Sequence, residues 1–369
     1  MILLSEMEHH ANIVPWQLPP PRRDPPQTGG LDSTPSPLRG ATLRRGSTPS
    51  PDLTLGGEPR SGREAGVGLR WIPVTDSGEL DLSNLDELLN GVKLVAVTQM
   101  SNVLGTVNNV KFITEKAHAV GAKILVDAAQ SVPHMPVDVQ DLDCDFLVFS
   151  GHKMCGPMGI GILYAKQELL EQMEPYQRGG DMILEVTKET ATWNELPYKF
   201  EAGTPNAAGA VGLGAAIDYL SAIGMEKIWE HEQELSRYGL EQLSKLSGVR
   251  VLGTPTTPAR IIPTSTSENA KRPLRGNGSH PPGATPLRQG GMGRGAIFAL
   301  DIPSVHPHDI GSILDEHHIA VRAGHHCAQP LHHRFGLTAT TRASCYLYNT
   351  KEDIEALFSG IKTIQAMFS

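Results

Sequence analysis

Short apolar runs alternate with amphipathic segments through the middle of the chain. Four runs have the length of a buried strand: KLVAVTQMSN, AKILVDAAQS, DFLVFSGHK and GIGILYAK. We predict that the first of these strands ends near Asn102. The segment VKFITEKAHAVG lies between the first two runs and has a helical pattern, with Gly121 as its expected C-terminal stop. Alternation of this kind predicts a mainly parallel sheet with flanking helices, and therefore an α/β fold.

The second half of the chain has a different pattern. The segment AGTPNAAGAVGLGAAIDYLSAIG predicts a helix with Thr204 as its N-cap and Pro205 as its first residue. A second long helix follows in MEKIWEHEQELSRYGLEQLSKLSG. The remaining apolar runs are short and precede one final helix: GVRVLG, GAIFALDI, IAVRAG, TTRASCYLYN and KEDIEALFSGIKTIQAMF. We expect a smaller α+β domain at this end of the chain.

Two segments lack apolar periodicity and are rich in proline and glycine: residues 18–68 and 254–293. They bury too little apolar surface to offset the entropy lost on ordering, so we predict that both are disordered insertions. The arginines of the first insertion suggest RNA binding, but a solvated linker is the favoured interpretation. The large domain would then comprise residues 1–17 and 69–230, and the small C-terminal domain would comprise residues 231–369.

The composition narrows the class of protein. The 369 residues suffice for one large domain and a smaller one. The formal net charge is -8, from 32 basic and 40 acidic residues, which argues against a nucleic-acid-binding protein. The four cysteines include no CxxC pair and fit a reducing compartment.

The start of the chain, MILLSEMEHH, lacks the basic region and the long apolar run of a signal peptide. No stretch approaches the ~20 apolar residues that a membrane helix needs. We therefore expect a cytoplasmic protein without membrane contact, with the plastid stroma as the alternative compartment.

Polar residues follow the predicted strands at the edge where α/β sheets bind ligands. Asp127 follows the run ILV, and Lys153 follows FLVF with Ser150 and His152 beside it. Pyridoxal phosphate needs a lysine for its Schiff base, a carboxylate for its pyridinium nitrogen and donors for its phosphate. An isolated Asp is more often a helix cap, and an isolated Lys is more often a surface charge. Together, in these places, they favour this cofactor.

The stretch GHHCAQPLHH places four histidines and one cysteine within ten residues, 324–333. Imidazole and thiolate are good zinc or iron ligands, so a metal site is one interpretation. The adjacent side chains of His325, His326 and Cys327 cannot easily all face one ion. A structural loop is the favoured interpretation of the stretch taken alone. Beside Lys153 and Asp127, a nucleophilic Cys327 becomes the better hypothesis.

Several stretches in order resemble the SufS-type cysteine desulfurases: SEMEHHANIVPWQ, VDAAQSVPHMPVDVQDLDCDFLVFSGHKMCGPMGIGILY, FEAGTPN and RAGHHCAQPL. These enzymes belong to the class-V aminotransferase group of fold-type I pyridoxal phosphate enzymes. The resemblance covers residues 1–17, about 69–253 and 294–369. It implies a fold-type I large domain with a mainly parallel sheet, followed by a small α+β C-terminal domain. The family's large domain extends upstream of SEMEHHAN, so the resemblance also implies an N-terminally truncated chain with two insertions.

The resemblance implies roles for residues around the cofactor ring. Lys153 would carry pyridoxal phosphate as a Schiff base, and Asp127 would pair with its pyridinium nitrogen. Gln130 would bind the phenolic oxygen. His10, in EHHAN, would stack on the ring and take part in catalysis.

Other roles implied by the resemblance concern the phosphate and the substrate. Ser150 and His152 would bind the phosphate, which Thr204 would reach from the partner subunit of a homodimer. A separate pair of residues, Asn102 and Arg342, would orient the substrate carboxylate.

The reaction implied by the resemblance is the conversion of L-cysteine to L-alanine. Lys153 would act as general base, and the thiolate of Cys327 would accept the sulfur as a persulfide. An acceptor protein of the SufE or SufU type would then take the sulfur for iron–sulfur cluster assembly. Two alternatives stay open: a selenocysteine lyase acting on L-selenocysteine, and a catalytically weak chain that serves as a dimer partner or sulfur-transfer docking module.

Overall fold

The computed structural model of the chain describes residues 1–17, 68–253, 293–303 and 305–368. The predicted disorder of 18–68 and 254–293 therefore lies outside the described residues, except at the two glycines that end these segments. The carbonyl of Gly68 accepts a hydrogen bond from the N–H of Ile2 at 2.9 Å. Gly293 pairs with Val107 in a short ladder. Both glycines belong to ordered structure, so each predicted insertion was drawn one residue too long.

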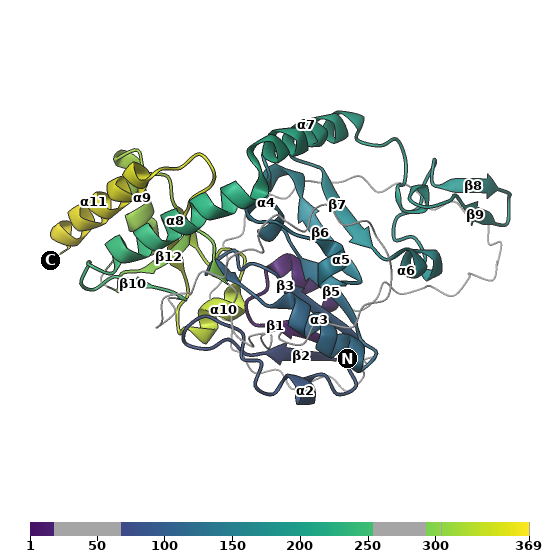
Figure 1. Cartoon of the computed structure of the whole chain (residues 1–369), viewed down its shortest axis with the longest axis horizontal. Helices are drawn as coiled ribbons and strands as arrows, with labels where there is room; N and C mark the ends of the chain where they lie inside the picture. Colours follow the sequence, from purple (N-terminus) through teal and green to yellow (C-terminus); the bar gives the residue numbers. More distant parts are fainter. Residues whose placement is uncertain (18–67, 254–292, 304, 369) are drawn as a thin grey trace, which may run out of the picture.

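A six-stranded sheet forms the centre of the larger unit (Figure 1). Its strands are, in spatial order, β2 (Leu69–Ile72), β1 (Ile2–Ser5), β3 (Leu94–Thr98), β5 (Lys123–Asp127), β6 (Phe146–Ser150) and β7 (Gly161–Ala165). The first five are parallel to one another, and β7 is antiparallel to β6. The mainly parallel sheet predicted from the sequence is confirmed. The parallel strands all end at one edge, as ligand-binding sheets of this class do.

The strand predicted to end near Asn102 ends at Thr98 instead. The hydroxyl of Ser101 accepts hydrogen bonds from the N–H groups of Val103 and Leu104, which turns the chain away from the sheet. The turn leads into β4 (Thr106–Val107), which pairs with β11 (Gly293–Arg294). Asn102 therefore lies in a turn above the sheet edge and not in the strand.

Helices cover the sheet because their apolar faces pack on it. The helices of the larger unit are α1 (Val14–Gln17), α2 (Leu85–Leu88), α3 (Val110–Ala119), α4 (Ser131–His134), α5 (Val139–Leu142), α6 (Gln167–Gln172) and α7 (Ala207–Ile223). In α3, the side chain of Asn109 caps the N-terminus by accepting from Phe112 N–H. Gly121 follows the helix with φ +74°, which confirms the predicted stop.

The N-cap predicted for α7 was wrong. Asn206 caps the helix through its side chain, which accepts from Gly209 N–H at 2.9 Å, and the helix begins at Ala207. Thr204 and Pro205 precede the cap, since the helical hydrogen bonds start two residues later than the Thr–Pro pattern suggested. Within the described part of the chain no single helix is long and apolar enough to cross a membrane. Only α7 and α8 (Met225–Leu243) together meet that test, with a 72° bend between them.

The smaller unit is an antiparallel sheet with helices on it. Its strands in spatial order are β10 (Arg250–Val251), β12 (Ile297–Asp301), β14 (Thr340–Ser344) and β13 (Arg322–Gly324). Its helices are α9 (Pro307–Glu316), α10 (Gln329–Arg334) and α11 (Lys351–Met367), and α8 packs on β12. A Cβ on Gly239 of α8 would lie 2.4 Å from the ring of Phe298, so only glycine allows this close approach.

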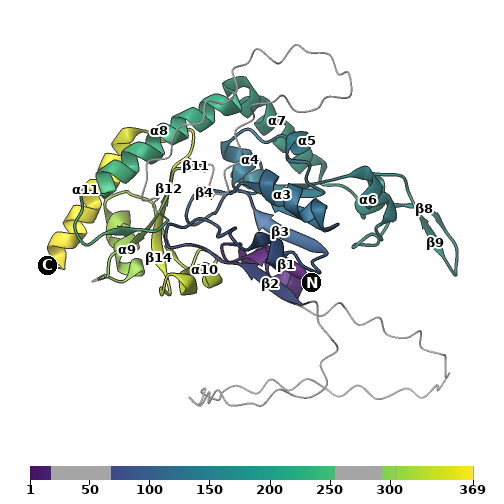
Figure 2. The same cartoon turned by 60° about the horizontal axis from the view of Figure 1, so that its bottom comes forward.

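The helix α8 belongs to both units (Figure 2). Ile228 joins an apolar cluster with Leu213 and Leu220 of α7. Further along the helix, Leu235 and Leu243 join the core of the small sheet. The boundary drawn at residue 230 from the sequence falls inside this continuous helix. One continuous helix therefore contributes side chains to the apolar cores of both units.

A buried arginine fastens the chain next to residues 254–292. Arg294 is 6% exposed, and its guanidinium donates to the carbonyls of Leu252, Gly253 and Ile297. Burial lowers the pKa of this guanidinium to about 10. The three carbonyl contacts hold β10 and the start of β12 at one point.

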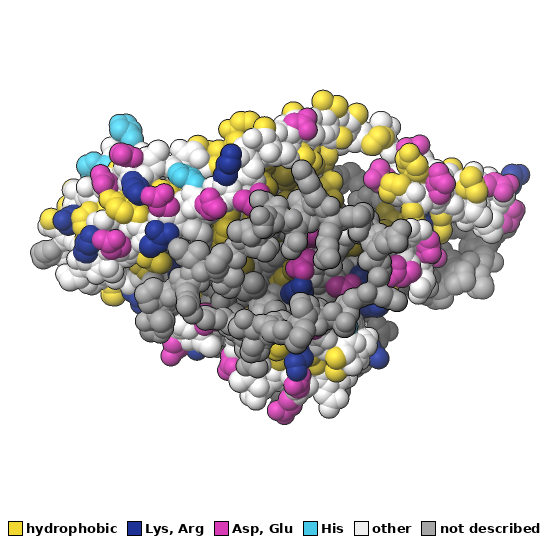
Figure 3. Space-filling view, in the orientation of Figure 1, with side chains coloured by type: hydrophobic (Ala, Val, Ile, Leu, Met, Phe, Trp, Pro, Cys, Tyr) yellow, Lys and Arg dark blue, Asp and Glu magenta, His cyan; other side chains and the backbone are white. Residues whose placement is uncertain are grey.

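A two-stranded arm projects from the larger unit, formed by β8 (Ile183–Val186) and β9 (Ala191–Trp193) (Figures 1 and 2). Leu184 and Val186 on this arm are 74% and 62% exposed. Hydrophobic side chains also gather on the outer face of α7, where Val211 is 76% exposed (Figure 3). The β8–β9 arm and the outer face of α7 therefore both present exposed apolar side chains.

Candidate active site

Two functional side chains lie where neighbouring parallel strands end. Asp127 is the last residue of β5, and its Oδ1 accepts from Ala129 N–H at 3.0 Å as the chain turns into α4. Lys153 ends the 3₁₀ helix Gly151–Lys153 that directly follows β6. Because Asp127 pairs in register with Val148 of β6, both side chains belong to the same edge of the sheet.

The environment of Lys153 lowers the pKa of its amine. Burial is the main cause that lowers its pKa; the charge of Asp127 opposes the effect, and the charge of Arg342 adds to it. Among the described residues, Nζ has no hydrogen-bond or ion-pair partner. A half-buried amine with no partner beside a carboxylate is the arrangement that pyridoxal phosphate requires. The residues present therefore fit this cofactor: Lys153 would hold it covalently and Asp127 would bind its ring nitrogen.

The structure places His9, and not the predicted His10, near these two residues. Burial chiefly lowers the pKa of His9, and the charges of Lys153 and Asp127 also act on it. His10 instead accepts a hydrogen bond from Gln329 N–H at 3.1 Å, and its ring lies 5.3 Å from that of His325. Sequence reasoning chose between two adjacent histidines without knowing which way the turn faces.

A buried acid holds this histidine turn against the sheet. Glu8 is fully buried and accepts from Asn12 Nδ2 at 2.7 Å, from Thr98 N–H at 3.0 Å and from the Ser5 hydroxyl. Burial is the main cause that raises the pKa of Glu8 to about 8, and these three donors oppose it. These contacts fix Glu8 in place, and with it the start of the histidine turn. Glu8 remains protonated at neutral pH.

The Cys327 loop connects β13 to α10 in an unusual backbone conformation. His326 and Cys327 have backbone φ angles of +50° and +58°. Residues other than glycine rarely adopt positive φ angles. Two contacts stabilise it: Cys327 N–H donates to His325 Nδ1 at 3.1 Å, and His10 N–H donates to the Cys327 carbonyl at 2.7 Å. Consecutive left-handed residues of this kind are typical of functional loops that the surroundings hold in place.

Two buried histidines behind the loop share one hydroxyl. His332 Nδ1 lies 3.0 Å from the Ala328 carbonyl, which can only accept, so this nitrogen carries the proton. His332 Nε2 is then an acceptor for the Thr340 hydroxyl at 3.1 Å. The same oxygen lies 2.9 Å from His326 Nε2 and must accept there. His326 is therefore protonated on Nε2 and neutral, in line with a pKa that burial chiefly lowers to about 3.

Asn102 and Arg342, the predicted substrate residues, contact each other and the loop. Arg342 Nη1 donates to the Asn102 carbonyl at 2.8 Å, and Asn102 Nδ2 donates to the His326 carbonyl at 2.7 Å. Within the described ranges, Arg342 Nε is buried and has no partner. An unpartnered buried N–H is costly, so it indicates a place for a ligand acceptor such as a carboxylate.

Sequence reasoning missed Arg322, which lies opposite Arg342 in the β13–β14 register. Its Nη2 lies 3.6 Å from Cys327 Sγ. The signal was available, because Arg322 opens the quoted stretch RAGHHC. It was missed because the sequence does not show that the loop after β13 brings the sulfur back toward a residue five positions before it.

The remaining predicted residues are less closely joined to this group. Gln130 and Ser150 are half-buried at the same sheet edge, and His152 is exposed beside Lys153. Thr204 is exposed, and no contact in the described part of the chain ties it to Lys153 or Asp127. Its predicted role depends on a partner subunit. Among the described residues, no group of three or more His, Cys, Asp or Glu side chains lies close enough together to bind a metal ion.

Comparison with known proteins places the chain in a family. The family model for class-V aminotransferases matches residues 60–269 and 289–357. A probable cysteine desulfurase of Streptomyces coelicolor is 41% identical over 368 residues, covering 100% of this chain and 70% of that protein. The cysteine desulfurase of Haloferax volcanii is 38% identical over 369 residues, covering 100% of this chain and 68% of that protein. The chain belongs to the class-V aminotransferase family.

Solved structures agree with this assignment. The crystal structure of the cysteine desulfurase CsdA from Escherichia coli has a TM-score of 0.74 and 31% identity, covering 100% of this chain and 72% of the other. The cysteine desulfurase of Thermococcus onnurineus has a TM-score of 0.73 and 32% identity, with 98% and 72% covered. The family and the fold-type I class predicted from the sequence are confirmed. Class-V aminotransferases of this group use pyridoxal phosphate, as Lys153 and Asp127 predicted.

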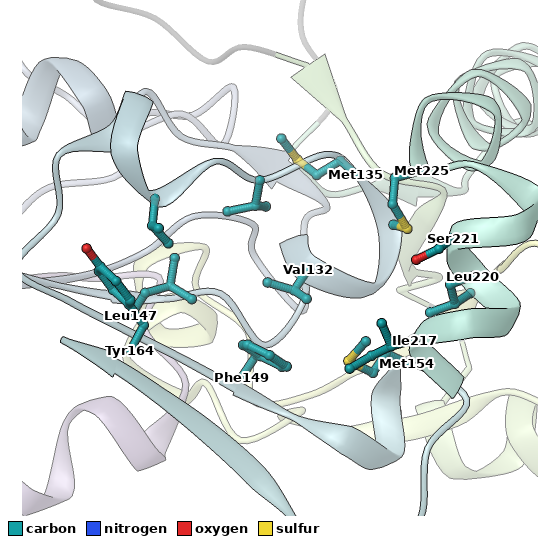
Figure 4. A pocket seen from close by; sticks show the side chains of 12 residues that line it. Val132, Met135, Leu147, Phe149, Met154, Tyr164, Ile217, Leu220, Ser221 and Met225 are labelled. Carbon is teal, nitrogen blue, oxygen red and sulfur yellow. The ribbon is translucent and has the colours of Figure 1, made fainter. Parts of the chain in front are cut away.

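An apolar cavity lies away from Lys153, Asp127 and Cys327 in this class-V aminotransferase (Figure 4). It has a volume of about 270 Å³ and lies between the β6–β7 face of the sheet, α4 and α7. Phe149, Tyr164 and Leu220 are among the side chains that line it, and none of the lining side chains is charged. Pyridoxal phosphate and an amino-acid substrate need charged partners, so this apolar cavity is not their site.

Proposed function

We propose that this chain is a cysteine desulfurase that converts L-cysteine into L-alanine and leaves the sulfur on Cys327 as a persulfide. The proposal rests chiefly on one observation: Lys153, which follows β6 of the six-stranded sheet, and Cys327, which follows β13 of the four-stranded sheet, lie close enough for their charges to interact. The charges of Asp127 and Cys327 both act on the amine of Lys153. The names of the relatives support the choice of L-cysteine as substrate.

Each residue of the chain has a defined task in this reaction. Arg342 binds the substrate carboxylate through its unpartnered Nε–H and positions the amino acid. When bound, pyridoxal phosphate draws electrons from the substrate carbon that carries the amino group. Lys153, once its amine is free, takes the proton from that carbon, for which a lowered pKa suits it.

The sulfur transfer balances without an external oxidant. The thiolate of Cys327 attacks the substrate sulfur and forms an S–S bond, while the bond between the substrate's β-carbon and its sulfur breaks. The electron pair of the broken bond stays on the substrate, and two protons, from the α-carbon and the thiol, return to it to give alanine. The products are alanine and a persulfide on Cys327.

The sulfur acceptor and the assembly state follow from the resemblance to SufS-type enzymes. We infer an acceptor of the SufE or SufU type and a role in iron–sulfur cluster assembly. A homodimer is supported by the exposed apolar side chains of the β8–β9 arm and of α7. All four cysteines are free, which supports the cytoplasm or another reducing compartment.

The test is to incubate the purified chain with pyridoxal phosphate, L-cysteine and a thiol reductant, and to measure alanine and sulfide. The proposal requires both products in equal amounts and requires that Cys327→Ala lose both while still binding the cofactor. Production of alanine by Cys327→Ala at the normal rate would overturn the assignment of the nucleophile. L-selenocysteine, offered in parallel, tests the lyase alternative: a rate that exceeds the cysteine rate manyfold would favour it.

A further inference from the structure

The sulfur of Cys327 has a charged neighbour. Arg322 Nη2 lies 3.6 Å from Sγ, within hydrogen-bonding range for sulfur. Arg322 is exposed, whereas Cys327 is half-buried and its loop is fixed by backbone contacts to His10 and His325. The guanidinium therefore approaches a sulfur that the loop holds in place.

Two arginines lie directly opposite each other near this sulfur. Arg322 of β13 pairs with Arg342 of β14 in an antiparallel register. Like charges in this position destabilise a sheet. The charge of Arg322 also adds to burial in lowering the pKa of Arg342. Neither guanidinium forms an ion pair with an acid among the described residues, so an anion bound between them would offset the repulsion.

We propose that the two arginines divide two anions between them: Arg322 binds the thiolate of Cys327, and Arg342 binds the carboxylate of the substrate. The assignment rests on the proposed function, in which Cys327 is the nucleophile. Arg342 is anchored on the Asn102 carbonyl and keeps a buried Nε–H for a ligand. Arg322 is the one that contacts sulfur.

An arginine suits this task because its charge does not depend on pH in the range where a thiol ionises. The thiolate, and not the thiol, attacks the substrate sulfur. After transfer, the terminal sulfur of the persulfide carries the negative charge that the thiolate carried before. Arg322 lies at the exposed side of the site, so it remains beside the sulfur that an acceptor must collect.

The first test measures the thiol directly and needs no cofactor. Iodoacetamide alkylates the cofactor-free chain at a series of pH values, and mass spectrometry follows the Cys327 peptide, with the exposed Cys155 in the same sample as reference. For Arg322→Gln we expect the pH of half-maximal alkylation rate at Cys327 to rise by about one unit, as loss of a nearby opposite charge does. Arg322→Lys restores part of the shift, and the exposed Arg237→Gln causes none. An unchanged midpoint in Arg322→Gln would overturn the proposal.

The second test separates the two arginines in the holoenzyme. Arg322→Gln lowers kcat for sulfide release at neutral pH, leaves KM for L-cysteine within about twofold, and recovers part of kcat as the pH rises. Arg342→Gln chiefly raises KM. A raised KM with unchanged kcat in Arg322→Gln would instead identify Arg322 as a substrate-binding residue. That result would overturn the assignment of the thiolate to Arg322. If the wild-type chain releases no sulfide, the proposed function fails, while the alkylation series still decides whether Arg322 stabilises the thiolate.

Discussion

The backbone N–H of His10 donates to the carbonyl of Cys327 at 2.7 Å, joining residues that are far apart in the sequence. A second hydrogen bond, from Gln329 N–H to His10 Nε2, attaches His10 to the segment that follows Cys327. The segment that follows β1 thus holds the loop that carries Cys327. It also carries His9, whose pKa is lowered chiefly by burial and also by the charge of Lys153.

We predict different effects for the two neighbouring histidines. His10→Ala removes the acceptor for Gln329 N–H, so backbone amides of residues 325–329 exchange with deuterium faster and sulfide release slows about tenfold. The cofactor absorbance remains. His9→Ala shifts or weakens that absorbance and leaves the loop amides unchanged. The opposite pattern would restore His10 as the residue at the cofactor ring.

Lys153 is expected to carry the cofactor. With added pyridoxal phosphate, the protein should show an absorbance band at ~400–430 nm, which is absent in Lys153→Ala. Lys166→Ala is the matched control, since Lys166 is bound to Asp143 at the opposite end of the sheet. A band that survives in Lys153→Ala after dialysis would contradict the assignment.

The hydroxyl of Thr340 is expected to stabilise the loop through both histidines. Thr340→Val keeps the shape of the side chain but leaves the buried nitrogens of His326 and His332 without their shared partner. We expect unfolding free energy to fall by roughly 2–4 kcal/mol, since each orphaned buried polar group costs ~1–3 kcal/mol. Thr340→Ser keeps the hydroxyl and should lose less. Equal losses in the two variants, measured by urea unfolding, would rule out the hydroxyl as the cause.

Glu8 makes the stability of the chain depend on pH. Its pKa is raised from 4.5 to about 8 in the folded state, so folding favours the protonated form. This contribution is full below pH 4.5 and is lost as pH rises toward 8, by roughly 5 kcal/mol in all. Glu8→Gln should flatten the decline, whereas the exposed Glu87→Gln should retain it. Urea unfolding from pH 5 to 8 provides the measurement, and an equal slope in Glu8→Gln would show that another group is responsible.

The sequence predicted the strands well because each is a short apolar run whose end is marked by a polar residue. Asp127 and Lys153 could be recognised at the sheet edge for that reason. The end of β3 was misplaced because the polar residue Asn102 was taken to mark it, whereas the strand ends at Thr98 and the hydroxyl of Ser101 turns the chain. Local hydrogen bonds of this kind do not alter the pattern of apolar residues.

Contacts between distant strands were beyond sequence reasoning. Arg322 is an ordinary exposed arginine until the β13–β14 register sets it against Arg342 and the Cys327 loop. The sequence also could not show the different surroundings of His9 and His10, since adjacent residues of one motif differ only in the direction that the 3₁₀ turn gives them. Apolar periodicity indicates which face is buried but not which partner a polar group meets.

The three carbonyl contacts of Arg294 have a consequence for the evolution of this protein. Because the chain is fastened on both sides of residues 254–292, its length there can change greatly at little entropic cost to the fold. Descendants of one ancestral gene could gain or shed sequence at this junction while the Cys327 loop keeps its place. The same junction offers engineers a position where a foreign peptide can be grafted.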